Sequence, residues 1–212
     1  MVLEGCRARA PVTHSTHDIM STEAHPESTK APPGTAEFAM KIFMASWTLS
    51  FVALISAYVY MRALADLWPP DGAPRPPLKL TTISTVAAVV SSGVLQIGVH
   101  RANRGDRSLL AASVGGTAGL GMLFLVLQSL AGVDATARGL VPTLNAYGAL
   151  FWITAVFHAL HVVVGVVALV ALWARIRSAR APSSLTLRLW SYYWHGVDLA
   201  WLAIYFVMFL PG

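Results

Sequence analysis

The chain has 212 residues, of which 56% are hydrophobic and only 12% are charged, and its mean hydropathy is +0.60. These values exclude an ordinary water-soluble domain, in which about a quarter of the residues are charged. The net charge of +5 does not indicate a nucleic-acid partner, because the basic residues lie in connections between apolar runs, where they favour anionic lipid. We therefore expect a membrane protein with a single membrane domain.

The first 36 residues contain no apolar run, and proline and glycine interrupt a sequence rich in serine and threonine. This composition is typical of a segment that is disordered or bound to a partner. No apolar core precedes Phe38, so the segment lacks the pattern of a secretory signal. We predict a tail over residues 1–36 and a membrane domain over residues 37–212.

Five apolar runs follow the tail, and each is long enough to cross a hydrocarbon layer of about 30 Å at about 1.5 Å per residue. The expected helices cover residues 38–62, 78–100, 108–132, 147–173 and 187–210. The connection over 101–107 is short, which makes the second and third helices antiparallel neighbours. The fold class predicted is an all-α polytopic membrane protein, a bundle of five transmembrane helices.

An odd number of spans places the two termini on opposite sides of the membrane. The basic residues expected on one side are Arg7, Arg9, Lys30, Arg101, Arg104, Arg107, Arg175, Arg177, Arg180 and Arg188. Those expected on the other side are Arg62, Arg75, Lys79 and Arg138. Because cytoplasmic loops carry an excess of basic residues, this asymmetry predicts a cytoplasmic N-terminus and a C-terminus outside.

Few histidine or carboxylate side chains fall in the interior of the predicted spans. They are His158 and His161 in the fourth span and His195 and Asp198 in the fifth, where Asp198 is the one acidic residue within a span. The members of each pair are three residues apart, so each pair lies on one helix face. A charge at the bilayer centre costs at least about 2.5 kcal/mol, so such residues face other helices and bind one another or a functional ligand.

Three interpretations of these residues are open. Histidine suits a metal or haem, although carboxylate di-metal sites in helical bundles also use several glutamates, and no glutamate falls in a span. A proton relay would need a continuous path, whereas the first three helices offer hydroxyls and amides such as Ser46, Ser50, Thr85, Ser92, Gln96 and Gln128. We favour a structural hydrogen-bond network, in which Asp and His partners offset each other's desolvation. No catalytic, cofactor-binding or metal-binding residue is expected.

Two motifs in the last two predicted helices carry a resemblance to a known family. Residues 157–165 read Phe-His-Ala-Leu-His-Val-Val-Val-Gly, and residues 193–201 read Tyr-Trp-His-Gly-Val-Asp-Leu-Ala-Trp. Their order and spacing resemble subunit III of haem–copper respiratory oxidases, where the patterns are Phe-His-Gly-x-His-Val-x-x-Gly and Tyr-Trp-His-Phe-Val-Asp-x-x-Trp. Residues 56–62 are more loosely similar to the end of an earlier helix of that family. The likeness covers the membrane portion and fits the short five-helix bacterial form.

The resemblance implies an accessory, non-redox subunit of a haem–copper terminal oxidase, that is, a non-catalytic part of an enzyme complex in aerobic respiration. Such a subunit packs against subunit I and other oxidase subunits, holds phospholipid, and supports stability and proton uptake. Haem and copper would belong to the partner subunits, and the chain would lie in the bacterial cell (inner) membrane. The residues expected in a structural polar network or in lipid contact are His158, His161, His195, Asp198, Trp194 and Arg62.

The chain departs from the family pattern at two positions. A carboxylate usually follows the serine in the first of these helices, and here Trp47 follows Ser46. The Glu-Tyr pair that usually follows a glutamine is absent after Gln128. Alternatives are therefore a related component of a quinol oxidase or nitric oxide reductase complex, a freestanding transporter, or an intramembrane metalloenzyme.

Overall fold

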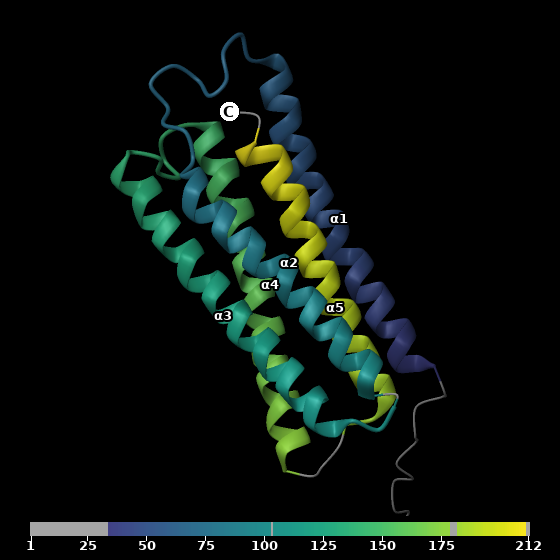
Figure 1. Cartoon of the computed structure of the whole chain (residues 1–212). Coiled ribbons are helices and arrows are strands. Elements are labelled where there is room, and N and C mark those ends of the chain that lie inside the picture. The colour runs from purple at the N-terminus through teal and green to yellow at the C-terminus, as the bar shows by residue number, and fades with distance from the viewer. Residues whose placement is uncertain (1–33, 103, 179–181, 211–212) are drawn as a thin grey trace, which may run out of the picture. The chain divides into compact units, whose positions relative to one another are not determined.

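The computed structural model describes residues 34–102, 104–178 and 182–210. The regular elements of these residues are α1 (Thr35–Leu64), α2 (Leu78–Ala102), α3 (Arg107–Ala137), α4 (Ala146–Arg177), α5 (Ser184–Ile204) and a short π-helix, η1 (Tyr205–Phe209) (Figure 1). Most of the tail predicted over residues 1–36 lies outside the described residues. The predicted boundary between the tail and the membrane domain stays a prediction. α1 begins at Thr35, two residues before the predicted start of the membrane domain at residue 37.

The prediction of an all-helical fold with five helices is confirmed for the described residues. Helices α1 to α4 are long and apolar enough to cross a membrane. α5 is not among these four, and His195 and Asp198 interrupt its apolar run. α3 and α4 continue past their predicted ends. In α4 the added turn contains Arg175 and Arg177, whose positive charges are favourable at the negative end of the helix dipole.

The last turn of the chain differs from the predicted regular helix over 187–210. The α-helix stops at Ile204 and continues as the wider η1. The rings of Phe209 and Trp201 lie 6.0 Å apart, and the ring of Phe151 on α4 lies 5.7 Å from Phe209. The wider turn therefore ends with two of its aromatic side chains, Tyr205 and Phe209, buried against the bundle.

Helices α2 to α5 form a closed ring, in which α2 contacts α3, α3 contacts α4, α4 contacts α5, and α5 contacts α2. Successive helices run in alternating directions along the bundle (Figure 1). α1 packs outside this ring through large side chains. Met44 and Trp47 of α1 contact α5 at Gly196, where a β-carbon would lie 2.6 Å and 3.3 Å from them.

α2 and α3 are neighbours, as their short connection predicted. They approach closely at Gly98, where a β-carbon would lie 2.3 Å from the β-carbon of Ser113. The chain turns between them at Gly105, whose φ of 84° favours glycine. Asp106 then caps α3 by accepting a hydrogen bond from the backbone N–H of Leu109 (3.0 Å).

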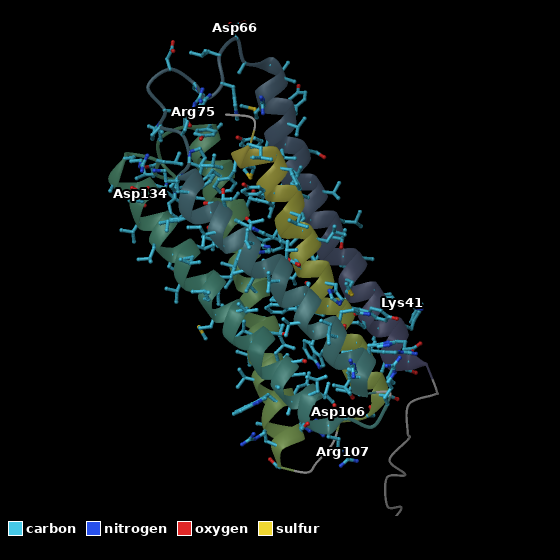
Figure 2. All side chains as sticks on the ribbon, in the orientation of Figure 1. Lys41, Asp66, Arg75, Asp106, Arg107 and Asp134 are labelled. Carbon is cyan, nitrogen blue, oxygen red and sulfur yellow. The ribbon has the colours of Figure 1, made fainter. Side chains whose placement is uncertain are left out.

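Charged side chains gather at the two ends of the bundle. Figure 2 shows Asp66, Arg75 and Asp134 at one end and Lys41, Asp106 and Arg107 at the other. The second end also holds Arg101, Arg104, Arg175, Arg177 and Arg188, while Arg180 lies outside the described residues. Between the ends, many large apolar side chains of the helices point outward. This distribution is that of a bundle surrounded by lipid, with its ends in the polar interfaces.

Candidate functional site

Polar side chains join α2 to the C-terminal helix along much of its length, and we call this contact the α2–α5 seam. Its hydrogen bonds link Thr82 to Tyr205 (2.9 Å), Trp201 to Thr85 (2.9 Å), Trp194 to Ser91 (3.0 Å), Ser92 to Asp198 (2.6 Å) and His195 to Gln96 (3.2 Å). Because the two helices run in opposite directions, residues late in α2 meet residues early in α5. The seam brings together the polar groups of two helices that are otherwise largely apolar.

Two hydroxyl groups of the seam, those of Ser91 and Thr85, serve two partners each. Ser91 donates to the carbonyl of Ala88 on its own helix (2.6 Å) and accepts from the indole N–H of Trp194. Thr85 donates to the carbonyl of Thr81 (2.7 Å) and accepts from the indole of Trp201. A hydroxyl carries one donor and two acceptor positions, so each of these groups can make both bonds at once. Within lipid, where no water competes, each indole N–H thereby avoids the cost of an unsatisfied polar group.

Trp194 contacts every other helix of the ring. Its indole donates to Ser91 on α2, and its ring fills space that glycine leaves open on two further helices. A β-carbon would lie 2.5 Å from the Trp194 ring at Gly121 on α3, and 2.9 Å from it at Gly165 on α4. The side chain is only 5% exposed. Small residues at these two positions therefore create the space in which Trp194 packs.

The hydrogen bonds of His195 and Asp198 are made to α2 and not to α4. Asp198 accepts from Ser92, and His195 is bonded to Gln96. The sequence suggested that these groups would pair with the histidines of α4. No hydrogen bond of the described residues joins them. The reason is the rotation of α5 about its axis, which aims its polar face at the hydroxyls and amide of α2.

His161 reaches α5 through its backbone. Its Nδ1 is bonded to the carbonyl of Phe157 on the same helix (2.7 Å), and its own carbonyl accepts from the hydroxyl of Tyr193 (2.9 Å). Tyr193 is 1% exposed, so this bond is buried between α4 and α5. Sequence reasoning did not single out Tyr193 or Ser91 as site residues. The signal that would have found Ser91 is its recurrence with Thr85 and Ser92 on one side of α2.

His158 is 2% exposed, and aromatic rings surround it. Its ring centroid lies 5.9 Å from Phe51, 5.8 Å from Phe124 and 5.0 Å from Trp201. Neither of its ring nitrogens has a hydrogen-bond partner among the described residues, and the same holds for Oδ1 of Asp198. In a native structure, buried polar atoms of this kind call for an explanation.

A wide apolar cleft of about 530 Å³ lies between α3, α4 and the end of α5. Phe124 and Gly132 line it from α3, Trp152 and His158 from α4, and Phe209 from η1. A second groove of about 470 Å³ lies between α3 and α4 and is lined by small residues of α3 together with Trp173. Both hollows have the size and apolar lining of sites for small hydrophobic molecules or acyl chains.

α3 and α4 touch where a tryptophan of α4 meets a glycine of α3. A β-carbon at Gly132 would lie 3.2 Å from the ring of Trp152, and one at Gly115 would lie 2.8 Å from Nε1 of Trp173. Trp152 also donates to the carbonyl of Leu140 (2.8 Å).

In the described part of the chain, no group of three or more His, Cys, Asp and Glu side chains is placed to hold a metal ion.

Comparison with known proteins identifies the family. The sequence profile of cytochrome c oxidase subunit III matches residues 13–212. The chain is 34% identical to the "Probable cytochrome c oxidase subunit 3" of Nocardia farcinica, over 77% of this chain and 82% of the relative. It is 30% identical to the protein of the same name in Mycobacterium leprae (84% and 88% covered), and 27% identical to the "Cytochrome c oxidase subunit 3" of Synechocystis (84% and 76% covered).

The chain belongs to the cytochrome c oxidase subunit III family. The resemblance noted in the sequence is thereby confirmed, as is the assignment to a membrane protein of a haem–copper oxidase. Membership in the subunit III family implies association with other oxidase subunits. The second family motif, over 193–201, supplies Trp194, His195, Asp198 and Trp201 to the α2–α5 seam.

The two departures from the subunit III pattern have structural counterparts. Trp47 is buried where a carboxylate was expected, its ring lies 5.3 Å from that of His161, and its Nε1 has no partner among the described residues. Gln128, which lacks the usual Glu-Tyr sequence after it, donates to Ser84 of α2 (2.8 Å). Trp47 thus makes an aromatic contact where the family has a carboxylate. Gln128 makes an interhelical hydrogen bond next to the place where the family has its Glu-Tyr pair.

The six predicted site residues do not form one cluster, although His158, Trp194 and Asp198 line one small cavity. Trp194, His195 and Asp198 lie in the α2–α5 seam, while His158 and His161 lie on α4 among aromatic rings. Arg62 lies in the last turn of α1 and makes none of the hydrogen bonds of the seam.

Proposed function

We propose that the chain is the accessory, non-redox subunit III of a haem–copper terminal oxidase in an aerobic respiratory chain of a bacterial inner membrane. In this proposal it packs on catalytic subunit I, and haem and copper lie in the partner subunits. The observation that carries it is the α2–α5 seam, because the polar groups that the second family motif contributes are used in bonds between helices. Such bonds stabilise a scaffold, and of the seam residues in this motif Asp198 alone keeps a buried side-chain atom, Oδ1, without a partner among the described residues.

The proposed orientation places the N-terminus in the cytoplasm and the C-terminus outside. The support is the basic end of the bundle, where Arg101, Arg104, Arg107, Arg175, Arg177 and Arg188 gather. Basic residues near span ends remain on the cytoplasmic side during insertion. Thiol labelling of single cysteines placed at Ser178 and at Asp71, in intact cells, tests this orientation. Labelling of the position at Ser178 from outside would reverse it.

We assign a structural role to the intramembrane polar residues. Asp198→Ala removes the acceptor of the Ser92 hydroxyl, and we expect it to lower the free energy of unfolding by about 1–3 kcal/mol, the cost of a buried unsatisfied group. Asp198→Asn keeps an acceptor oxygen and serves as the matched control. Thermal denaturation of the purified complex measures both. Equal midpoints for Asp198→Ala and the unmodified protein would contradict this role.

Phospholipid is the proposed occupant of the wide cleft. Its apolar and aromatic lining suits an acyl chain, and Ala137, one residue before Arg138, forms part of its wall. Arg62 lies at the same end of the bundle as Arg138, because α1 and α3 both finish there. Arg138 is paired with Asp134 (2.7 Å), so the guanidinium of Arg62 is the better candidate to attract an anionic headgroup. Mass spectrometry of lipid retained by the complex, before and after Ala155→Phe narrows the cleft, tests this proposal.

Support of proton uptake would be indirect in this proposal. Within the described spans the seam residues are bonded to one another, so the chain would act on subunit I by packing against it and by holding lipid around it. A complex depleted of this chain should then keep its haem spectrum but lose activity faster during turnover. Unchanged turnover lifetime after depletion would remove this part of the proposal.

The decisive experiment is purification from native membranes in mild detergent, followed by mass spectrometry and a haem spectrum. We expect the chain to co-purify with a haem-bearing subunit I. The electron donor of the complex then separates a cytochrome c oxidase from a quinol oxidase, and its electron acceptor, oxygen or nitric oxide, separates an oxidase from a nitric oxide reductase. A chain isolated without any haem-bearing partner, with substrate flux in liposomes, would favour a transporter instead.

A further inference from the structure

Two polar side chains with unused hydrogen-bonding atoms line the same small cavity. They are His158 of α4, whose two ring nitrogens have no partner among the described residues, and Asp198 of α5, whose Oδ1 has none. The other carboxylate oxygen of Asp198 accepts from Ser92. These atoms are therefore oriented by the fold, since packing holds the imidazole and a hydrogen bond holds the carboxylate.

The cavity has a volume of about 20 Å³, and apolar groups such as Ala88, Val162 and Val197 form much of its remaining wall. A cavity needs about 10–15 Å³ on this measure to hold one water, and a water inside a protein needs two or more polar partners. The cavity meets both conditions. A metal ion fits less well, because a structural metal site uses about four ligands and the cavity offers two ionisable side chains.

We propose that this cavity binds a single water molecule, which bridges a ring nitrogen of His158 to Oδ1 of Asp198. The water donates one hydrogen bond to the carboxylate. With the imidazole it makes a second hydrogen bond, as donor or as acceptor, because a neutral imidazole has one acceptor nitrogen and one donor nitrogen. The bridge extends the seam from Ser92 of α2 through Asp198 of α5 to His158 of α4. It supplies the α4–α5 polar link that direct hydrogen bonds do not make, and it rests on the structural role proposed above for these residues.

The direct test is a structure of the chain in its native complex, at a resolution that reveals ordered water. We expect one peak within about 3 Å of both a His158 ring nitrogen and Asp198 Oδ1. A cavity without density, or a direct contact between the two side chains, would overturn the proposal. A peak at about 2.0–2.2 Å from its ligands would indicate a metal ion instead.

Filling the cavity with a larger side chain gives a second test. The thermal midpoint should fall if the cavity holds water and rise if the cavity is dry. Val162→Ile adds one methylene at a wall residue. Displacing the water leaves both polar groups without a partner, so we expect the thermal midpoint to fall by about 2–4 °C. Filling a dry cavity would raise the midpoint, and that result would overturn the proposal.

The matched control for this test is Val114→Ile, at a residue that is 1% exposed and lines none of the three hollows described. It measures the general cost of one extra methylene in this core. A second control repeats Val162→Ile in a His158→Phe background, where the imidazole is gone. The cost of Val162→Ile should shrink in that background if the water binds His158, and an unchanged cost would contradict the bridge.

These outcomes are separable from those of the proposed function. A complex that co-purifies with its haem-bearing subunit but has a dry cavity would retain the accessory role and lose the water site. A chain that never co-purifies with such a subunit would lose the accessory role, whatever the cavity contains.

Discussion

The two sides of α5 are held by different interactions. Toward α2, indole, hydroxyl, carboxylate and amide groups form the hydrogen bonds of the seam. Toward α1, the contacts are aromatic. The ring of Tyr193 lies 6.3 Å from Trp47 and 6.2 Å from Phe43, and Met44 packs on Gly196. A polar link on this side, the ion pair between Glu37 and Arg188, lies at the exposed end of the helices.

This difference matters because lipid supplies no hydrophobic drive between helices. Hydrogen bonds formed inside the bundle cannot be replaced by lipid, whereas apolar contacts with α1 can be. α1 also buries only 17% of its most apolar stretch, against 39% for α2 and α3. We therefore expect α1 to be the most easily displaced helix of the described bundle, and the one with most surface left for a neighbouring protein.

The largest effect should come from the residue that joins the whole ring. Trp194→Ala removes a buried ring from between Gly121 and Gly165 and leaves Ser91 without its indole donor. We expect a loss of about 3–5 kcal/mol in the free energy of unfolding. Thermal denaturation of the purified complex measures it. Tyr192→Ala, at a neighbouring aromatic residue that is 56% exposed, is the control, and equal losses for the two variants would refute this account of Trp194.

Adding a methyl group at each of two glycines of α3 should distinguish the tightly packed part of its surface from the open part. Gly121→Ala forces the new carbon against Trp194 and Val166, with an expected cost of about 1–3 kcal/mol. Gly119→Ala meets no atom within 4 Å. It should be neutral or stabilising by up to about 1 kcal/mol, because alanine favours the helix. Comparable thermal midpoints for both variants would show that Trp194 does not pack as described.

A pair of tryptophan replacements compares the two sides of the bundle directly. Trp201→Phe removes the bond to Thr85, for which we expect about 0.5–1.5 kcal/mol beyond the packing change. Trp47→Phe removes an N–H that has no partner among the described residues, so its hydrogen-bond cost should be close to zero. The same denaturation assay checks both. A larger loss for Trp47→Phe would mean that α1 is held by a polar contact.

The smallest expected effect lies at the basic end of the bundle. Hydrogen bonds from the Leu109 N–H and the Ser108 hydroxyl lower the pKa of Asp106 below its ordinary value. A lowered pKa means that the cap stabilises α3 above the unfolded value of about 3.9 and loses this contribution as the pH falls through the lowered pKa. Asp106→Asn caps without a charge. Its thermal midpoint should lie below that of the unmodified protein at pH 7 and converge with it in acid.

Residue patterns predicted the helices and the pairing of α2 with α3, but not the partners of α5. The apolar runs located five helices, and the three-residue spacing correctly put His195 and Asp198 on one face. The pattern could not show that this face meets Ser92 and Gln96 of α2 instead of the histidines of α4. Nor could it show that Trp194 lies in the interior, because its space depends on two glycines that are far away in the sequence.

The sequence by itself determined the number, the approximate ends and the apolar character of the helices. A backbone in lipid must satisfy its own hydrogen bonds, and the local sequence decides where this is achieved. Only the tertiary structure decided how each helix is rotated and which neighbour it faces. The apolar faces of these helices are chemically alike to lipid. The rotation of each helix therefore depends on a few contacts between residues that are far apart in the sequence, such as the Trp194 ring with Gly121 and Gly165, and the Asp198 carboxylate with Ser92.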